Sequence, residues 1–330
     1  MGKYARGMIL ALLIAIPAYW LGKTFPIIGG PVFGILLGMI LAGIKRPDTF
    51  EPGIKYSGKK VLQYSIILLG FEMNLYNVIS VGASSFSVMI FTLLTAFVVA
   101  LVVGRLLRLD LKMTTLVGAG TAICGGSAIA AVAPVIEAED KDIAFSISTI
   151  FLFNVLAVFI FPFLGHWMGL SDSGFGMWAG TAINDTSSVV AAGYSYSNAA
   201  GDYATIVKLT RALMIVPICV IIAGIVIWSK KKAGGAGDSN FKVSRIFPWF
   251  ILWFVVASII NTTGILAPSV SHFLGQAGKF FIIVAMVAIG LNTNLIHLLK
   301  NGVKPIALGL VCWFAVASVS LLVQHSIGLI

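Results

Sequence analysis

Residues 120–131 read GTAICGGSAIAA and residues 180–191 read GTAINDTSSVVA. Both stretches open with the same four residues, and two further positions recur in the same register, Ser127 as Ser187 and Ala131 as Ala191. Each stretch also places glycines or short polar residues inside an otherwise apolar block. Such residues disfavour a continuous helix, so the repeat predicts two broken helices, near residues 113–136 and 174–197.

The composition surrounding this repeat is that of a membrane protein. Of 330 residues, 59% are hydrophobic and 10% are charged, and the mean hydropathy is +1.02. A soluble domain has about 25% charged residues. The apolar residues form continuous blocks of about 20, which suit helices in a lipid bilayer and not the alternating strands of a barrel. We therefore expect an all-α polytopic membrane protein.

Eleven apolar blocks are recognised, and they predict about eleven transmembrane helices. The blocks lie near residues 7–23, 27–44, 61–82, 84–106, 113–136, 143–165, 174–197, 203–229, 246–264, 280–299 and 305–326. No gap between them is long enough for a soluble domain, so residues 1–330 are expected to form a single membrane domain. The three cysteines lie within apolar blocks and predict neither disulfides nor a metal site.

The net charge of +10 follows from topology, because the Lys and Arg residues gather in alternate gaps. With the N-terminus in the cytoplasm, seventeen lie on the inner side and only Lys23, Lys141 and Lys279 on the outer side. The C-terminus and the acidic turn 137–140 are then outside. A re-entrant segment would reverse everything after it, although two would cancel. The basic charge thus gives no reason to expect nucleic acid as a partner.

A second pair of segments is also similar: ILLGFEMNL at 67–75 and VAIGLNTNL at 287–295. On the eleven-span arrangement this pair runs in opposite directions, as inverted-repeat transporters require. The GTAI pair runs in the same direction, which the arrangement does not explain.

Polar residues inside the spans predict where a binding site lies. Counted at 1.5 Å per residue, Gly125, Asp185, Glu72 and Asn292 are each roughly 16–18 Å deep in a core about 30 Å thick. Secondary transporters bind substrate and coupling ions at this depth, on discontinuous helices.

The first break supplies candidate substrate-binding residues, namely Thr121, Cys124, Gly125, Gly126 and Ser127. Ser127 is expected to cap a second half-helix, whose N-terminus would attract an anion. The alternative is that these small residues only allow neighbouring helices to approach closely.

The second break supplies the remaining candidates. Asn184, Thr186, Ser187 and Ser188 are expected to bind substrate, and Asp185 to bind the coupling ion. A carboxylate in the middle of a span must face protein or water, so the alternative is a structural pair with Arg211 or Lys208. Glu72 is a second coupling-ion candidate, in a stretch that is either a break or a span end.

Two cations occupy the eighth block. Arg211 is expected to pair with a carboxylate or to face an anionic substrate, whereas Lys208 is expected to extend to the outer surface. Asn154, inside the sixth block, would either join helices or line a cavity.

The motifs WAGTAINDTSSVVAAG (178–193) and VGAGTAICGGSAIAA (117–131) resemble the YeiH-like bacterial inner-membrane family, described as putative sulfate exporters. The segment LLGFEMNL is more distantly similar to the bile-acid:sodium symporter superfamily. These resemblances imply a bacterial inner-membrane location. They also imply a panel and a core domain, with two broken helices crossing at the midplane and an elevator-like motion.

The function that we expect is secondary active transport of a small anion, such as sulfate or an organosulfonate, coupled to a proton or sodium gradient. No ATP-binding P-loop occurs. No cofactor is expected, and a homodimer is left open. The alternatives are a passive anion channel and an intramembrane enzyme, the second of which lacks the required motifs.

Overall fold

The computed structural model describes residues 2–25, 29–232, 248–293 and 303–330, and every regular element within these ranges is a helix. The first helices are α1 (Gly2–Thr24), α2 (Gly30–Ala42), η1 (Asp48–Phe50), α3 (Glu51–Tyr56), η2 (Ser57–Val61) and α4 (Leu62–Gly70). The next are α5 (Leu75–Leu106), α6 (Leu111–Ala122), α7 (Gly126–Val132), α8 (Asp140–Trp167), α9 (Asp172–Ala182) and α10 (Thr186–Tyr196). The last are α11 (Asn198–Leu213), α12 (Ile215–Lys232), α14 (Trp249–Thr262), α15 (Pro268–Leu291) and α17 (Val303–Ser326).

Six helical stretches among the described residues are long and apolar enough to cross a membrane. They are 3–24, 75–106, 141–167, 198–226, 268–291 and 303–326. The expectation of an all-helical polytopic membrane protein is therefore confirmed, whereas eleven crossings would require the segments 113–136 and 174–197 to span the membrane.

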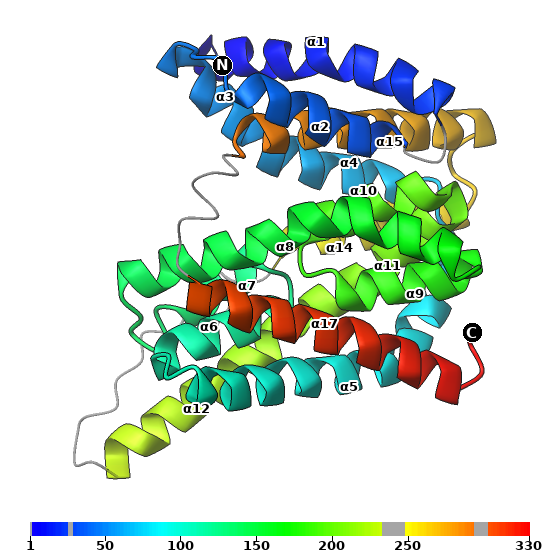
Figure 1. Cartoon of the computed structure of the whole chain (residues 1–330). Helices are drawn as coiled ribbons and strands as arrows, with labels where there is room; N and C mark the ends of the chain where they lie inside the picture. Colours follow the sequence, from blue (N-terminus) through cyan, green and yellow to red (C-terminus); the bar gives the residue numbers. More distant parts are fainter. Residues whose placement is uncertain (1, 26–28, 233–247, 294–302) are drawn as a thin grey trace.

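The helices form two groups that pack against each other (Figure 1). In one group α15 packs against α2 and α4, and α1 packs against α2. In the other group α5 packs against α6 and α17, while α11 packs against both α9 and α10. Helix α10 also contacts α2 and α15, so it joins the two groups.

Helices α4 and α15 are antiparallel neighbours. Gly58, before α4, lies against Ile289 near the end of α15, whereas Leu68, near the end of α4, lies against Gly278. The segment 67–75 therefore lies at the end of α4 and the segment 287–293 at the end of α15, and these two ends lie at opposite ends of the antiparallel pair. The similarity of the two segments predicts such an inverted arrangement. Residues 294 and 295 of this second repeat lie outside the described ranges.

The segment that contains the first GTAI motif is a helical hairpin. The Lys112 ammonium at the start of α6 donates to the Glu137 carbonyl at 2.7 Å. A continuous helix would separate residues 25 apart by about 37 Å. The Ile129 side chain in α7 also packs against Gly120 in α6. Helix α7 therefore returns alongside α6, and the tip of this hairpin is Ile123–Gly125.

The segment that contains the second GTAI motif folds back in the same way. At its base, Ser197 Oγ donates to Asp172 Oδ1 at 2.6 Å, and the Tyr196 hydroxyl donates to the Leu170 carbonyl. The rings of Phe175 in α9 and Tyr196 in α10 stack with their centroids 3.9 Å apart. The tip of the second hairpin is 183–185.

The two hairpins enter from opposite ends of α8. The first joins the start of α8 through residues 133–139, and the second has its base at the other end, where His166 stacks on Tyr196. Helix α8 has 28 residues, so it is about 42 Å long and can cross a bilayer core of about 30 Å. Arms of 11 and 12 residues, such as α9 and α6, reach only about 17 Å and 18 Å, so the tips meet at mid-depth.

This geometry corrects the expectation that two broken helices cross at the midplane. In the segments 113–136 and 174–197 the first helices end at Ala122 and Ala182, and the chain reverses after each of them. Because the hairpins enter from opposite sides, the two GTAI motifs run in opposite directions, which removes the discrepancy found in the sequence. The two reversals cancel, so the direction of every later helix is unchanged.

Candidate functional site

Asn154 lies halfway along α8 and contacts both hairpin tips. Its Oδ1 accepts a hydrogen bond from the Asp185 backbone N–H at 3.1 Å. Its Nδ2 lies 3.6 Å from the position that a Cβ on Gly125 would occupy. The side chain is buried. Of the two roles left open for Asn154, the structure assigns the joining of segments.

Lys208 on α11 bridges the tips from another side. Its ammonium donates to the carbonyls of Ile123 and Ile183, each at 2.9 Å, and these residues are equivalent in the GTAI repeat. The side chain has 0% exposure. The expectation that Lys208 extends to the outer surface is therefore wrong, because the two carbonyls hold its charge inside the protein.

Arg211, one turn later, completes the bridge. Its Nε donates to the Ala122 carbonyl at 2.6 Å and its Nη2 to the Thr121 carbonyl at 2.5 Å. Its Nη1 donates to the carbonyl of Thr181, the residue equivalent to Thr121. The guanidinium is buried, as predicted, but it contacts backbone oxygens where a carboxylate or an anion was expected.

The electrostatic reason for these contacts is the polarity of the helices. Both α6 and α9 end at the tips, and the C-terminal end of a helix carries unpaired carbonyls and a partial negative charge. Lys208 and Arg211 are three residues apart, so they lie on one face of α11 and reach both ends together. The two cations thus position the tips in relation to each other.

The candidates of the first tip differ in accessibility. Cys124 and Thr121 are buried, Gly126 is half-buried and Ser127 is exposed. Helix α6 ends at Ala122 and α7 begins at Gly126, and the N-cap of α7 is Gly125, with φ 68°, and not Ser127 as expected. Glycine adopts positive φ without a steric penalty, which is why the chain reverses there. Ser127 lies in the first turn of α7.

At the second tip, Asp185 is the N-cap of α10. Its carboxylate accepts hydrogen bonds from the Ser187 backbone N–H at 3.0 Å and from the Ser187 hydroxyl. Ser187 and Ser188 are buried, whereas Asp185 and Thr186 are half-buried. The negative charge of Asp185 is thus held at a helix N-terminus, where it is favourable, while Lys208 and Arg211 contact carbonyls instead.

Two buried polar side chains at the tips have unused hydrogen-bonding capacity. Neither Oδ1 nor Nδ2 of Asn184 has a hydrogen-bond partner among the described residues, and Asn184 is only 1% exposed. The buried hydroxyl of Thr121 likewise has no hydrogen-bond partner among the described residues. An unsatisfied buried polar group costs about 1–3 kcal/mol. These groups therefore mark a place where a bound molecule would be stabilised.

Glu72 does not belong to this group of residues. It lies in the turn between α4 and α5, and its carboxylate contacts His272 and Lys279 of α15, each at 3.1 Å. The Lys279 ammonium lies 5.7 Å from the ring centroid of Tyr194, whose hydroxyl donates to Asp202 at 2.5 Å. Of the two sequence alternatives for Glu72, the structure favours a span end.

The depth assigned to Asn292 is corrected in the same way. It is the exposed residue that follows the last turn of α15, so it lies at a helix end and not at mid-depth.

Sequence reasoning underestimated Lys208 and Asn154. Each had a signal in the sequence: a cation three residues from a second cation inside an apolar block, and one amide in the middle of another. Neither signal identifies the partner, because both side chains contact backbone atoms of segments far away in sequence.

A comparison with known protein families places the chain. The family described as "Conserved hypothetical protein 698" matches residues 6–309. The chain belongs to this family. A UPF0324 membrane protein of Fusobacterium nucleatum is 46% identical over the whole of both chains. One from Streptococcus pyogenes serotype M3 is 49% identical over 98% of this chain and 97% of its own, and one from Clostridium tetani is 42% identical over 99% and 98%.

Membership of the family confirms the YeiH-like resemblance drawn from the two motifs. It also supports a multi-pass membrane protein, since the relatives are named as membrane proteins. Their names state no substrate, so the site must be interpreted from its own geometry.

Proposed function

We propose that the chain is a secondary active transporter of a small anion, with sulfate or an organosulfonate as the substrate class. The observation that carries the proposal is the meeting of two re-entrant hairpin tips at mid-depth, with the Asn184 amide buried beside them without a partner. Irregular backbone within a membrane is tolerated where protein or a water-filled cavity surrounds it. In transporters, discontinuous helices at this depth bind the substrate.

The charges at the tips favour an anion over a cation. Among the described residues that contact the tips, Lys208 and Arg211 are cationic and Asp185 is the carboxylate. The ends of α6 and α9 offset part of the positive charge. The N-terminal ends of α7 and α10, which begin at the same tips, carry a partial positive charge that balances these ends. The side chains then leave one positive charge, two cations against one carboxylate, in a region where Coulomb interactions are less screened than in water.

The residues have different roles in this proposal. Ser127 and Thr186 are accessible hydroxyls at the two tips, and Asn184, Thr121, Ser187 and Ser188 are the buried polar groups behind them. Arg211 and Lys208 position the tips and contribute charge without contacting the substrate directly. Asp185 remains the proposed coupling group for a proton or sodium ion, because it is half-buried at the same junction.

The two groups of helices are the basis for the proposed mechanism of alternating access. Contacts of α10 with α2 and α15 join the group that holds the tips to the group built around α15. Movement of one group past the other would expose the tips to each side of the membrane in turn. The opposite entry of the hairpins and the antiparallel α4–α15 pair support an inverted repeat, which such transporters use.

Counterflow exchange in proteoliposomes tests the proposal. Vesicles loaded with unlabelled sulfate or a small alkanesulfonate are diluted into the labelled anion, and transient accumulation is measured. A carrier gives accumulation above equilibrium, whereas a passive channel or an enzyme gives none. Absence of counterflow for every small anion tried would contradict the proposal.

Two asparagine variants test whether Asn184 belongs to the anion site. Asn184→Ala should weaken anion binding by about tenfold or more, because one hydrogen bond to a charged ligand contributes about 1.5–3 kcal/mol. Asn198→Ala changes an exposed asparagine at the start of α11 and should leave the affinity unchanged. Equal affinities for the two variants would remove Asn184 from the site.

A further inference from the structure

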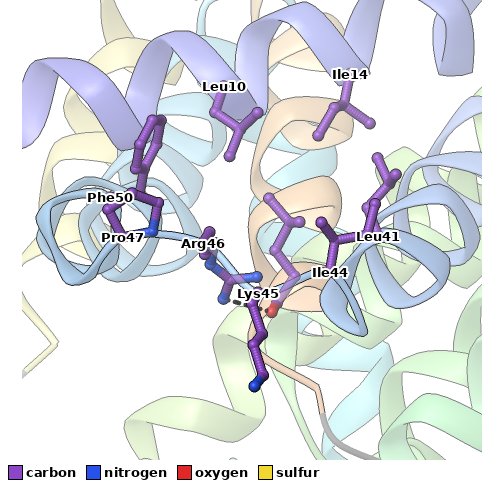
Figure 2. A pocket seen from close by; sticks show the side chains of 9 residues that line it. Leu10, Ile14, Leu41, Ile44, Lys45, Arg46, Pro47 and Phe50 are labelled. Carbon is purple, nitrogen blue, oxygen red and sulfur yellow. Dashed lines mark hydrogen bonds between the residues drawn. The ribbon is translucent and has the colours of Figure 1, made fainter.

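A cavity separate from the hairpin tips lies between the middle of α1, the end of α2 and the end of α15 (Figure 2). Its volume is about 230 Å³. Most of its lining is apolar, with Leu10 and Ile14 from α1 and Leu41 from α2 facing one another. The residues of the loop 44–47 and Phe50 close one end of it.

The apolar wall continues onto the lipid-facing surface. Ile9 and Leu13 on α1 are 57% and 58% exposed, and Ile44 beside the cavity is 62% exposed. Large aliphatic side chains exposed to this degree are stable in a bilayer, where acyl chains cover them. A hydrocarbon chain could therefore pass from the bilayer into the cavity without crossing a polar barrier.

Two cations stand at the loop end of the cavity. Arg46 is held in place, because its Nε and Nη2 donate to Glu51 Oε1 at 3.0 Å and 2.8 Å, and Nη2 also donates to the Leu291 carbonyl at 2.8 Å. Lys45 is exposed and extends away from α1 (Figure 2). Glu51 offsets the charge of Arg46, so Lys45 supplies the uncompensated charge at the loop end of the cavity, where its side chain points away from the apolar wall (Figure 2).

The wider surroundings are also basic. The start of α1 packs on α3, where the rings of Tyr4 and Tyr56 lie 4.9 Å apart. The cations that this end of the molecule carries are Lys3, Arg6, Lys45, Arg46, Lys55, Lys59 and Lys60, against the acids Asp48 and Glu51. Basic pockets between membrane helices on the cytoplasmic side bind the head groups of anionic lipids.

We infer that this cavity binds one anionic phospholipid, with an acyl chain between α1, α2 and α15 and the phosphate beside Lys45 and Arg46. The occupant is a lipid because the apolar walls of the cavity are open to the bilayer, and two cations, one fixed and one exposed, lie at the loop end. The inference is independent of transport, since none of these residues contacts the hairpin tips.

The test uses the full-length protein, delipidated in detergent and given phosphatidylglycerol or phosphatidylcholine with the same acyl chains. Bound lipid is counted by native mass spectrometry, and the affinity is obtained from a titration. Phosphatidylglycerol should bind at least about fivefold more tightly, since one nearby cation contributes about that factor. Equal affinities for the two lipids would overturn the inference.

Matched variants locate the site. Lys45→Gln should lower the affinity for phosphatidylglycerol about fivefold, whereas Lys59→Gln, an exposed lysine that does not line the cavity, should leave it unchanged. Leu41→Trp should fill the cavity and reduce binding of both lipids. Equal losses in the two lysine variants would show general surface attraction and contradict a built site.

Discussion

The side chains of Lys208 and Arg211 hold the two hairpins together at the level of single atoms. Between them they donate to the carbonyls of residues 121–123 and to those of Thr181 and Ile183. Arg211 donates to the carbonyls of the equivalent residues Thr121 and Thr181. Lys208 donates to those of the equivalent residues Ile123 and Ile183. The two copies of the GTAI repeat therefore occupy equivalent places in the structure, because both present the same backbone carbonyls to one pair of cations.

Lys208→Met should destabilise the protein markedly. The change leaves two buried carbonyls without a donor, and each unsatisfied group costs about 1–3 kcal/mol. We expect a fall of about 2 kcal/mol or more in the free energy of unfolding, measured as a lower Tm at constant detergent and lipid. Lys55→Met, at an exposed position, is the control. An unchanged Tm for Lys208→Met would contradict the bridging role.

Two adjacent glycines should respond differently to alanine. Gly125 has φ 68° and ψ −128°, a conformation that L residues adopt only at a cost of about 1–3 kcal/mol. Gly126 is helical, and a Cβ there would meet no atom within 4 Å. Gly125→Ala should therefore lower the Tm, whereas Gly126→Ala should leave it unchanged or raise it slightly. The opposite order would place the essential glycine at 126.

The helices show which part of the fold the sequence predicts. The breaks within 113–136 and 174–197 follow from Gly125 and from Asn184-Asp185, since these residues cannot extend an apolar helix. The reversal of the chain at each break does not follow from the sequence. A half-helix that continues in the same direction and one that turns back both require the same helix-breaking residues. The direction of α7 depends on the packing of Ile129 against Gly120, a contact that no local pattern encodes.

The site is predictable to the same extent. The polar residues of both breaks were found because they are unusual within apolar blocks. Glu72 was grouped with them because depth was counted along a span that in fact ends at Gly70. Its true neighbours, Lys279 and His272, lie about 200 residues away in sequence and become adjacent only when α15 packs on α4.

Glu72→Gln separates a structural role from a role in coupling. The carboxylate is half-buried and pairs with Lys279 on α15, so its loss should lower the Tm modestly, by about 1 kcal/mol or less in stability. Exchange in proteoliposomes should keep its proton or sodium dependence, because the hairpin tips are untouched. Asp185→Asn should alter that dependence. Loss of the dependence in Glu72→Gln would return Glu72 to the coupling site.

For the whole molecule, the hairpins redistribute charge across the membrane. Reversal of the first hairpin moves the turn 137–140 and Lys141 to the side that carries Lys112. The basic side then gains one cation, and of the cations in the described part of the chain, outside the buried pair, Lys23 and Lys279 alone remain opposite. The asymmetry becomes stronger than in the eleven-span arrangement, which agrees with the rule that positive loops stay in the cytoplasm.

Cysteine labelling distinguishes the two arrangements without reference to absolute orientation. In a background with Cys124, Cys219 and Cys312 replaced by serine, a single cysteine is introduced at Thr49, Glu139 or Asn198, all of them exposed. If both segments are hairpins, Glu139→Cys reacts with an impermeant maleimide from the same side as Thr49→Cys.

If both segments cross, Glu139→Cys reacts from the same side as Asn198→Cys. The described helices after residue 197 run in the same direction in both arrangements, so labelling at position 139 distinguishes them. Lys112 bonds to the Glu137 carbonyl at 2.7 Å, which a membrane between them would forbid. Labelling of residue 139 together with residue 198 would therefore refute the hairpins, and with them the site at their tips.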